Sequence, residues 1–291
     1  MKKLYLVLLC IALTLHVTAQ SKKKRSPAYN KQNNENDQFL EKQWWLGIKG
    51  GVNLSQVDVQ STYAIFSPIG NVEQSEKKYD RYKGLGSQIA MEVSFYFKSI
   101  SISFQPTYQH IQFSYTKNYA WGDAGTINRL EMKYDNQQKV DHILLPLVMK
   151  YEFNGNKLRP YLQAGLYQAI LISGRKNVTI IGTDYASGGK NEFEREPIAV
   201  DATDLFAKYH WGLIGGAGMY YNLGNVRFNL DLQYKYGLSN ITSTKNRYDN
   251  DMLVGAGDVM DDLNLNNISV SVGCLFPLRF LGSGFKSLDR K

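Results

Sequence analysis

The stretch VRFNLDLQYKYGL, which runs from Val226 to Leu238, separates into two sets of residues when every second position is read. One set is wholly apolar or aromatic, and the other contains Arg227, Asp231 and Lys235. Successive side chains of a β-strand point to opposite faces, so this stretch is typical of a strand with one apolar and one charged face. The fold depends on which of the two faces meets water.

The same alternation recurs after Trp44 and predicts eight strands. They are Trp44–Val57, Tyr82–Phe97, Ile100–Thr116, Val140–Asn154, Leu158–Gly174, Ala207–Leu223, Val226–Thr242 and Leu265–Leu278. An even number of antiparallel strands returns the chain to the side on which it started.

The gaps between these strands alternate in length. The short gaps suit tight hairpin turns and are Lys98–Ser99, Gly155–Lys157 and Gly224–Asn225. The long gaps have about twenty residues or more and are Asp58–Arg81, Lys117–Lys139, Arg175–Phe206 and Ser243–Asn264. Short turns at one end and long loops at the other predict an up-and-down meander.

Strand length and aromatic placement favour a membrane setting. The predicted strands have thirteen residues or more, whereas strands of globular proteins usually have about five or six, and 9–11 tilted residues cross a bilayer. Aromatic rings also collect near the strand ends, where a hydrocarbon layer would meet its headgroups. The predicted aromatic girdle consists of Trp44, Trp45, Tyr151, Phe153, Tyr209, Trp211, Tyr220, Tyr221, Tyr234 and Tyr236.

If the apolar faces point outward, the charged faces share a narrow lumen. The predicted interior charge network consists of Lys49, Glu92, Lys150, Glu152, Arg227, Asp231 and Lys235. Both signs are present, so these groups can pair with one another away from water. The predicted fold is therefore all-β, an eight-stranded antiparallel up-and-down transmembrane β-barrel with short periplasmic turns and long extracellular loops.

The two ends of the chain suggest export. Leu4–Val17 is an apolar run after two lysines and leads to small residues, so residues 1–19 are predicted to be a signal peptide. Residues 20–43 are then a flexible basic periplasmic arm, residues 44–278 an outer-membrane β-barrel, and residues 279–291 a short basic tail. With eight strands, both termini are expected in the periplasm and the protein in the cell outer membrane.

Several segments resemble the PorT-like outer-membrane β-barrel domain family of Bacteroidota. They are GIKGGVNLS (Gly47–Ser55), LLPLVMKYEF (Leu144–Phe153), LRPYLQAG (Leu158–Gly165), GGAGMYY (Gly215–Tyr221), YKYGLSNI (Tyr234–Ile241) and NNISVSVG (Asn266–Gly273). The resemblance implies the barrel fold and a place in the cell envelope. It supplies no catalytic residues.

Two clusters invite a chemical interpretation. His110, His142 and His210 fall near the long-loop ends of strands, with Asp141 and Asp201 nearby in sequence, as a rim hydrolase would require. No Ser or Cys nucleophile stands in a recognisable setting, so interfacial polar residues are the favoured interpretation. The acidic residues of the fourth long gap lack EF-hand spacing and are expected to be a solvated acidic loop. No catalytic, cofactor-binding or metal-binding residue is assigned.

The expected function is that of a non-enzymatic outer-membrane protein, a structural or partner-binding component of the cell envelope with a possible link to secretion or envelope assembly. The alternatives are a lipid- or peptide-modifying enzyme at the rim and a soluble lipocalin-like carrier. Lys22–Arg25 resembles a nucleic-acid patch and the net charge is +8, but the long gaps are acidic, so no nucleic-acid partner is expected. The expected partners are outer-membrane lipid and a periplasmic or extracellular protein. No cofactor is expected.

Overall fold

The structure is a computed structural model that describes residues 42–65, 72–74, 77–122, 129–153, 155, 157–185, 189–223 and 226–278. They belong to one compact unit, Glu41–Lys291. The predicted signal peptide and C-terminal tail lie outside the described residues, as does the arm up to residue 41. Lys42 and Gln43, which were assigned to the arm, begin the first strand instead.

The described residues fold almost entirely into β-strands. The long strands are β1 (Lys42–Ser61), β4 (Leu85–Phe97), β6 (Thr107–Trp121), β7 (Leu130–Glu152), β8 (Leu158–Asp184), β11 (Tyr209–Leu223), β12 (Val226–Asn240) and β13 (Asp262–Pro277). The shorter elements are β2 (Val72–Gln74), β3 (Lys78–Tyr79), β5 (Ile100–Phe104), β9 (Asn191–Glu194), β10 (Ile198–Asp201), the 3₁₀ turn η2 (Thr203–Leu205) and α3 (Asp251–Gly255). No helix in the described part of the chain has the length and apolar character needed to cross a membrane.

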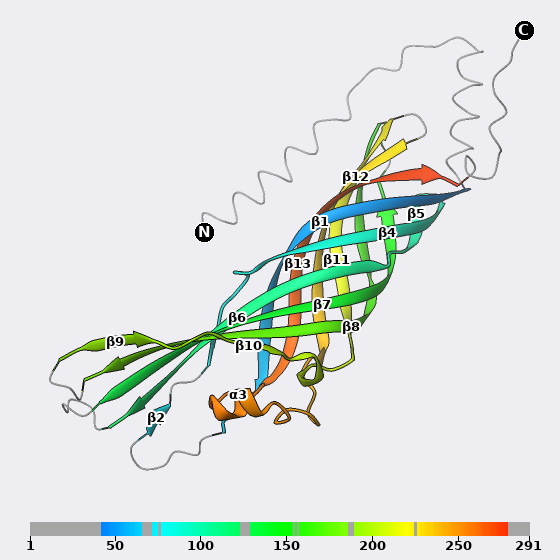
Figure 1. The fold of residues 1–291 in the computed structure, drawn as a ribbon. Helices are drawn as coiled ribbons and strands as arrows, with labels where there is room; N and C mark the ends of the chain where they lie inside the picture. The colour runs from blue at the N-terminus through cyan, green and yellow to red at the C-terminus, as the bar shows by residue number, and fades with distance from the viewer. Residues whose placement is uncertain are drawn as a thin grey trace, which may run out of the picture. The chain divides into compact units, whose positions relative to one another are not determined.

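The long strands form a closed antiparallel ring (Figure 1). Its order is β1, β4, β5 with β6, β7, β8, β11, β12, β13 and back to β1. β5 and β6 count as one strand, because both pair with β4 and β7 and are separated only by Gln105 and Pro106. The ring therefore has eight strands. Sequential neighbours pair throughout, as the meander predicted.

The strands β6, β7 and β8 run past their predicted ends. β6 continues to Trp121, β7 begins at Leu130 and β8 ends at Asp184, so much of the predicted loops Lys117–Lys139 and Arg175–Phe206 is strand. Figure 1 shows these strands running on past the ring, where β2 pairs with β6 and β9 with β8. We call residues 111–121, 130–140 and 174–184 the extension. Its inner positions mix apolar residues such as Phe113 and Met132 with the buried polar residues Lys117, Asn136, Gln138 and Lys176, and this mixture conceals the alternation.

The two faces of each ring strand differ as predicted. On β12, Leu232 is 50% exposed, whereas its neighbour Asp231 is 0% exposed. Exposed apolar side chains cover the outer wall of the ring and form what we call the outer belt: Trp44, Ile48, Val52, Ile89, Met91, Ile102, Phe104, Leu147, Met149, Leu162, Leu166, Leu213, Met219, Leu230, Leu232, Val270 and Val272. A soluble lipocalin-like carrier needs the reverse arrangement, so the fold contradicts that alternative.

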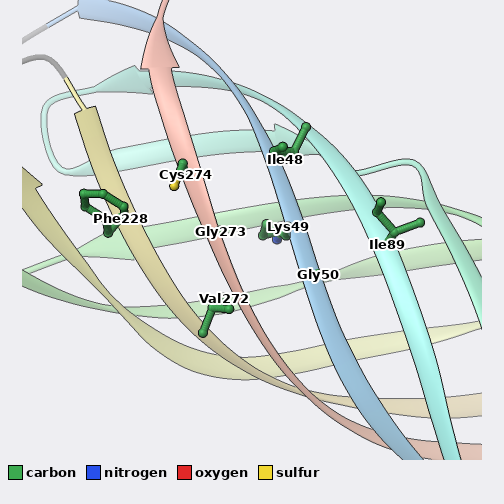
Figure 2. A pocket seen from close by; sticks show the side chains of 8 residues that line it. All are labelled: Ile48, Lys49, Gly50, Ile89, Phe228, Val272, Gly273 and Cys274. Carbon is green, nitrogen blue, oxygen red and sulfur yellow. The ribbon is translucent and has the colours of Figure 1, made fainter.

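A shallow hollow of about 420 Å³ lies on this wall. Figure 2 shows Ile48, Ile89 and Val272 around Gly50, while Lys49 lies on the other side of β1. Gly50 contributes to this hollow because it has no side chain, and a Cβ placed on it would meet no atom within 4 Å. The unpaired Cys274 is half-buried in its lining.

The interior has two regions of different character. Inside the ring, most buried side chains are polar, including lysines, glutamines and serines. Toward the extension, a hydrophobic cluster joins inward residues such as Ile111, Phe113 and Val178 to Leu205 of η2 and Leu253 of α3. The connection between β12 and β13 therefore packs into one end of the ring instead of extending freely into solvent.

Candidate functional site

The centre of the ring holds a buried charge network that joins opposite walls. Lys49 Nζ on β1 lies 2.9 Å from Glu92 Oε2 and 3.0 Å from Asp231 Oδ2, and it donates to Gln105 Oε1 at 2.8 Å. Lys150 Nζ on β7 lies 2.6 Å from Glu92 Oε1 and donates to the Tyr220 hydroxyl at 2.8 Å. Two ammonium groups thus share two carboxylates across the lumen.

A second group lies nearer the short turns. Arg227 Nη1 lies 3.3 Å from Glu152 Oε1, and Arg227 Nε donates to Asn222 Oδ1 at 2.9 Å. The guanidinium also lies 4.2 Å from the ring centre of Trp45, which adds a cation–π contact. The structure therefore brings together six of the seven residues predicted for the interior.

The seventh, Lys235, is buried but makes no ion pair with the described residues. Its Nζ donates to Ser269 Oγ at 3.0 Å and to Gln88 Oε1 at 3.3 Å. Neutral oxygens hold this ammonium group, so the buried network carries one more positive charge than negative.

The aromatic girdle needs two corrections. Trp44, Tyr151, Phe153, Tyr209, Trp211, Tyr221, Tyr234 and Tyr236 are exposed on the outer wall. Trp45 and Tyr220 are instead buried in the lumen, where both contact Arg227. The period of two explains the error: Trp44 and Trp45 are adjacent in sequence, as are Tyr220 and Tyr221, so one member of each pair must point inward.

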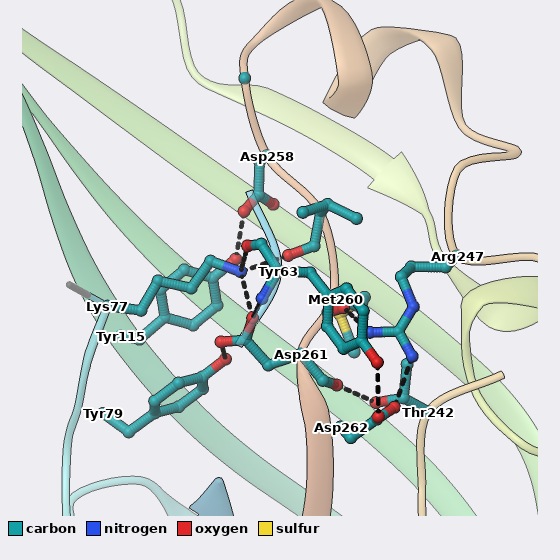
Figure 3. Close-up of polar contacts among 12 residues, drawn as sticks. Tyr63, Lys77, Tyr79, Tyr115, Thr242, Arg247, Asp258, Met260, Asp261 and Asp262 are labelled. Carbon is teal, nitrogen blue, oxygen red and sulfur yellow. Dashed lines mark hydrogen bonds and ion pairs between the residues drawn. The ribbon is translucent and has the colours of Figure 1, made fainter. Parts of the chain in front are cut away.

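The far end of the lumen is covered by a structure that sequence reasoning missed. We call residues 242–262 together with Tyr63, Lys77 and Tyr79 the cap. Three acid–base contacts hold it, and Figure 3 shows two of them, Lys77 with Asp261 and Arg247 with Asp262. Lys176 Nζ pairs with Asp258, Lys77 Nζ lies 2.8 Å from Asp261 Oδ1, and Arg247 Nη2 lies 2.5 Å from Asp262 Oδ1.

Each cap carboxylate also accepts a hydrogen bond from a tyrosine. Tyr115 donates to Asp258 at 2.5 Å, Tyr79 to Asp261 at 2.7 Å and Tyr63 to Asp262 at 3.1 Å. These donors come from β6, β3 and the segment after β1, so the cap ties together parts of the chain far apart in sequence. Each of these carboxylates therefore has one charged partner, a lysine or an arginine, and one neutral partner, a tyrosine hydroxyl.

The buried cap acids contradict the expected solvated acidic loop. Asp258 and Asp261 are buried, and only Asp249 and Asp251 of the same loop are exposed. Burial opposes ionisation of Asp258, yet the ammonium groups of Lys176 and Lys77 and the Tyr115 hydroxyl hold the pKa of its carboxyl below the usual value. Within the described residues, no three His, Cys, Asp or Glu side chains are placed to share a metal ion.

A buried lysine lies on the inner face of the extension. Lys117 is buried, and its Nζ lies 4.5 Å from the ring centre of Tyr119. Burial and the nearby charge of Lys77 lower the pKa of Lys117 to about 8. Within the described residues this amine has no hydrogen-bond partner.

The three histidines separate into two places. His110 Nδ1 lies 2.8 Å from Asp141 Oδ1 on the outer wall, whereas His142 and His210 are buried with ring centres 4.7 Å apart. Ser173 Oγ donates to Asp141 Oδ2 at 2.8 Å. The hydroxyl is thus directed at the carboxylate rather than at the imidazole, which is not the contact a serine hydrolase uses to activate its nucleophile.

The remaining aspartate named with these histidines lies elsewhere. Asp201 belongs to β10 and accepts hydrogen bonds from Thr203. The residues that suggested a rim enzyme are therefore not assembled into one site.

A polar groove lies on the outer face of the extension and has a volume of about 580 Å³. Its floor is formed by outward residues of β6, β7 and β8, such as Gln137 and Asn177. Asp80 and Lys83 line the groove next to β6, and Pro197 and Ala199 line it next to β8. We call this feature the outer groove. No sequence signal indicated it, because most of these positions were assigned to loops.

Comparison with known proteins identifies a family. Residues 19–243 match the family described as "Outer membrane protein beta-barrel domain". No curated protein matches the chain.

Several solved structures are similar at low identity. The crystal structure of Neisserial surface protein A is 11% identical over 79% of this chain and 96% of its own, with a TM-score of 0.28. The N-terminal β-barrel domain of Pseudomonas aeruginosa OprF is 14% identical over 81% of this chain and 99% of its own, with a TM-score of 0.30.

Proposed function

The chain belongs to the outer membrane protein beta-barrel domain family, and on that premise we propose that it is a non-enzymatic outer-membrane protein that binds another component of the cell envelope. The observation that carries this proposal is the interior of the ring. Its side chains are hydrogen-bonded from wall to wall, and the cap packs into one end. Binding then takes place on the outer wall, the cap or the short-turn end.

The orientation is part of the proposal. With eight strands, the beginning of β1 and the end of β13 lie at the same end of the ring, as do the hairpins Phe97–Ile100 and Leu223–Val226. Short turns face the periplasm in barrels of this class. We therefore place both termini in the periplasm, after export by a signal peptide, and the cap outside the cell. A PorT-like subfamily, a Bacteroidota source and a link to secretion or envelope assembly belong to the same proposal, supported by the sequence resemblance.

The filled interior predicts that the protein does not conduct ions as a porin does. Eight-stranded barrels have interiors just wide enough for side chains to fill. Purified protein in planar bilayers should therefore show no steady porin-like conductance under conditions in which a general porin conducts. Sustained conductance at moderate voltage would mean that the interior is open and would remove the basis of the proposal.

The partner can be sought from the cap. Tyr248 and Met252 are exposed on it, and a photo-crosslinking amino acid at either position should yield a discrete adduct in intact cells. The matched control is the same amino acid at Leu166, which is exposed in the outer belt and should react with lipid only. Identical products at the cap and belt positions would count against a partner at this end.

A further inference from the structure

On β6, β7 and β8, the outer wall changes character in an ordered series of rows. The register places His110, Asp141 and Ser173 side by side, immediately beyond the apolar Ile143 and Ile170. The following rows are Gln112–Lys139–Arg175, Ser114–Gln137–Asn177 and Thr116–Asp135–Thr179. Moving away from the short turns, the wall is thus apolar, then carries the His110–Asp141 pair followed by the two cations, and is then polar with one acid, Asp135.

Lys139 and Arg175 are direct cross-strand neighbours of the same charge. Such an arrangement destabilises a sheet unless an anion lies between the two groups. Among the described residues, neither forms an ion pair. Asp141 is engaged by His110, Tyr108 and Ser173. Asp201 lies opposite Arg175 in the register with β10, but its carboxylate accepts its hydrogen bonds from Thr203 and makes no ion pair with the guanidinium.

The outer groove begins one row beyond this pair. Asn177, Gln137 and Thr179 present amide and hydroxyl groups on its floor, and Lys83 and Asp80 stand at its side. Both hydrogen-bond donors and acceptors are available, and the exposed apolar residues of the described lining are the small Pro197 and Ala199, without the large aromatic anchors typical of a protein interface. A polyhydroxylated ligand matches this chemistry better than an apolar one.

We propose that this wall binds a phosphorylated glycolipid of the outer leaflet. The acyl chains lie against the outer belt, a phosphate lies between Lys139 and Arg175, and the sugar headgroup occupies the outer groove. The order of the three chemistries along the wall matches the order of the three parts of such a lipid. Arg and Lys are the usual ligands of lipid phosphates. The assignment rests on the proposed orientation, in which the extension faces the cell exterior.

The first test reverses the two cations. Lys139→Glu combined with Arg175→Glu should weaken binding of purified lipopolysaccharide to the detergent-solubilised protein at least tenfold. The matched control reverses Lys98 and Lys157, which lie at the short turns, and should leave binding unchanged. Heat-modifiable gel mobility checks that each variant is folded. If the double glutamate variant does not fold, Lys139→Gln with Arg175→Gln tests the same charges.

The second test separates sugar from phosphate. Asn177→Leu with Thr179→Val removes polar groups from the groove and should weaken lipopolysaccharide binding about tenfold while leaving phosphatidylglycerol binding unchanged. Inorganic phosphate alone should compete poorly with lipopolysaccharide.

Equal affinity of all variants for lipopolysaccharide would overturn the proposal. So would equal losses for lipopolysaccharide and phosphatidylglycerol in the groove variant, or a protein partner whose capture depends on these same residues. These measurements use neither conductance nor crosslinking from the cap. A failure here is therefore distinct from a failure of the proposed function.

Discussion

The ammonium group of Lys150 lies 2.6 Å from the carboxylate of Glu92, and neither side chain is accessible to solvent. Lys49 contacts the other oxygen of the same carboxylate at 2.9 Å. Glu92 therefore balances two buried cations that come from different strands, and the centre of the ring depends on one side chain.

Replacing Glu92 tests this dependence. Glu92→Gln should lower the free energy of unfolding by about 3–5 kcal/mol, because it leaves buried cations with too few anions. Urea titration in lipid vesicles, followed by tryptophan fluorescence, measures the change. The control is Glu192→Gln, which removes an exposed partner of Lys190 and should have no measurable effect. Equal effects of the two substitutions would contradict the role given to Glu92.

The inward position of Tyr220 gives a matched pair of substitutions. Tyr220→Phe removes the hydroxyl that accepts a hydrogen bond from Lys150 and should cost about 1.5–3 kcal/mol of stability. Tyr221→Phe alters the exposed neighbour on the outer wall and should be close to neutral. The same urea titration compares them. The reverse ranking would show that the two rings are placed the other way round.

An arginine introduced in the outer belt should destabilise the protein more than one introduced on the extension. Leu232→Arg places a charge in the apolar wall and should destabilise the barrel by about 2–4 kcal/mol if the residue lies near the bilayer midplane. Gln137→Arg introduces the same side chain on an outward position of the extension and should be mild. Folding yields into vesicles and urea midpoints of both variants provide the measurement. Comparable tolerance at the two sites would argue against a membrane around the belt.

The cap should respond to acid. Despite opposing burial, hydrogen bonds and charges from basic and hydroxyl partners lower the pKa values of Asp258 and Asp262 below those of the unfolded chain. Their stabilisation is therefore complete above the unfolded pKa, about 3.9, and is lost as pH falls through the folded values. Hydrogen exchange of residues 243–261, corrected for intrinsic rates, should accelerate between pH 5 and 3 on that basis. In Asp258→Asn, exchange should already be faster at pH 7, with a smaller further change on acidification.

Lys117 gives a separate prediction for the alkaline range. Burial lowers its pKa to about 8, so the folded chain binds this proton less tightly than the unfolded chain. Stability should rise with pH from about 8 toward the unfolded value of about 10.4. Lys117→Met should raise the free energy of unfolding by about 1–3 kcal/mol at pH 7, because it removes a buried amine without a hydrogen-bond partner. The gain should be smaller at pH 9.5, and a pH-independent gain would disprove the titration.

Local alternation was sufficient to predict the ring. VRFNLDLQYKYGL forms β12 with the faces assigned from its period, and the structure collects Lys49, Glu92, Lys150 and Asp231 at the centre. These residues could be grouped from sequence because inward-pointing charged side chains in a narrow closed ring must lie close to one another. Sequential pairing also needed no information beyond the alternating gap lengths.

The extension and cap could not be predicted in the same way. In β7, Lys133, Asp135 and Lys139 occupy outward positions and resemble a solvated loop, while inward Met132 and Tyr134 are too few to be recognised alone. The cap depends on contacts such as Lys77 with Asp261, which are separated by 184 positions. Such pairings arise from the path of loops in space, and sequence spacing does not encode that path locally.

The seam between β1 and β13 bears on how the protein reaches its final state. The register joins Trp45 to Pro277 and continues to Ser61 with Asp262, so the first strand acquires one of its two neighbours from the last strand of the ring. Until β13 has inserted, β1 and β12 each have an edge with unpaired backbone N–H and C=O groups. These groups find no hydrogen-bond partner in the hydrocarbon core of the bilayer. Insertion must therefore be completed after the C-terminal strand is available. A chain truncated before Asp262 should be held by periplasmic chaperones or degraded, even though most of its strands are intact.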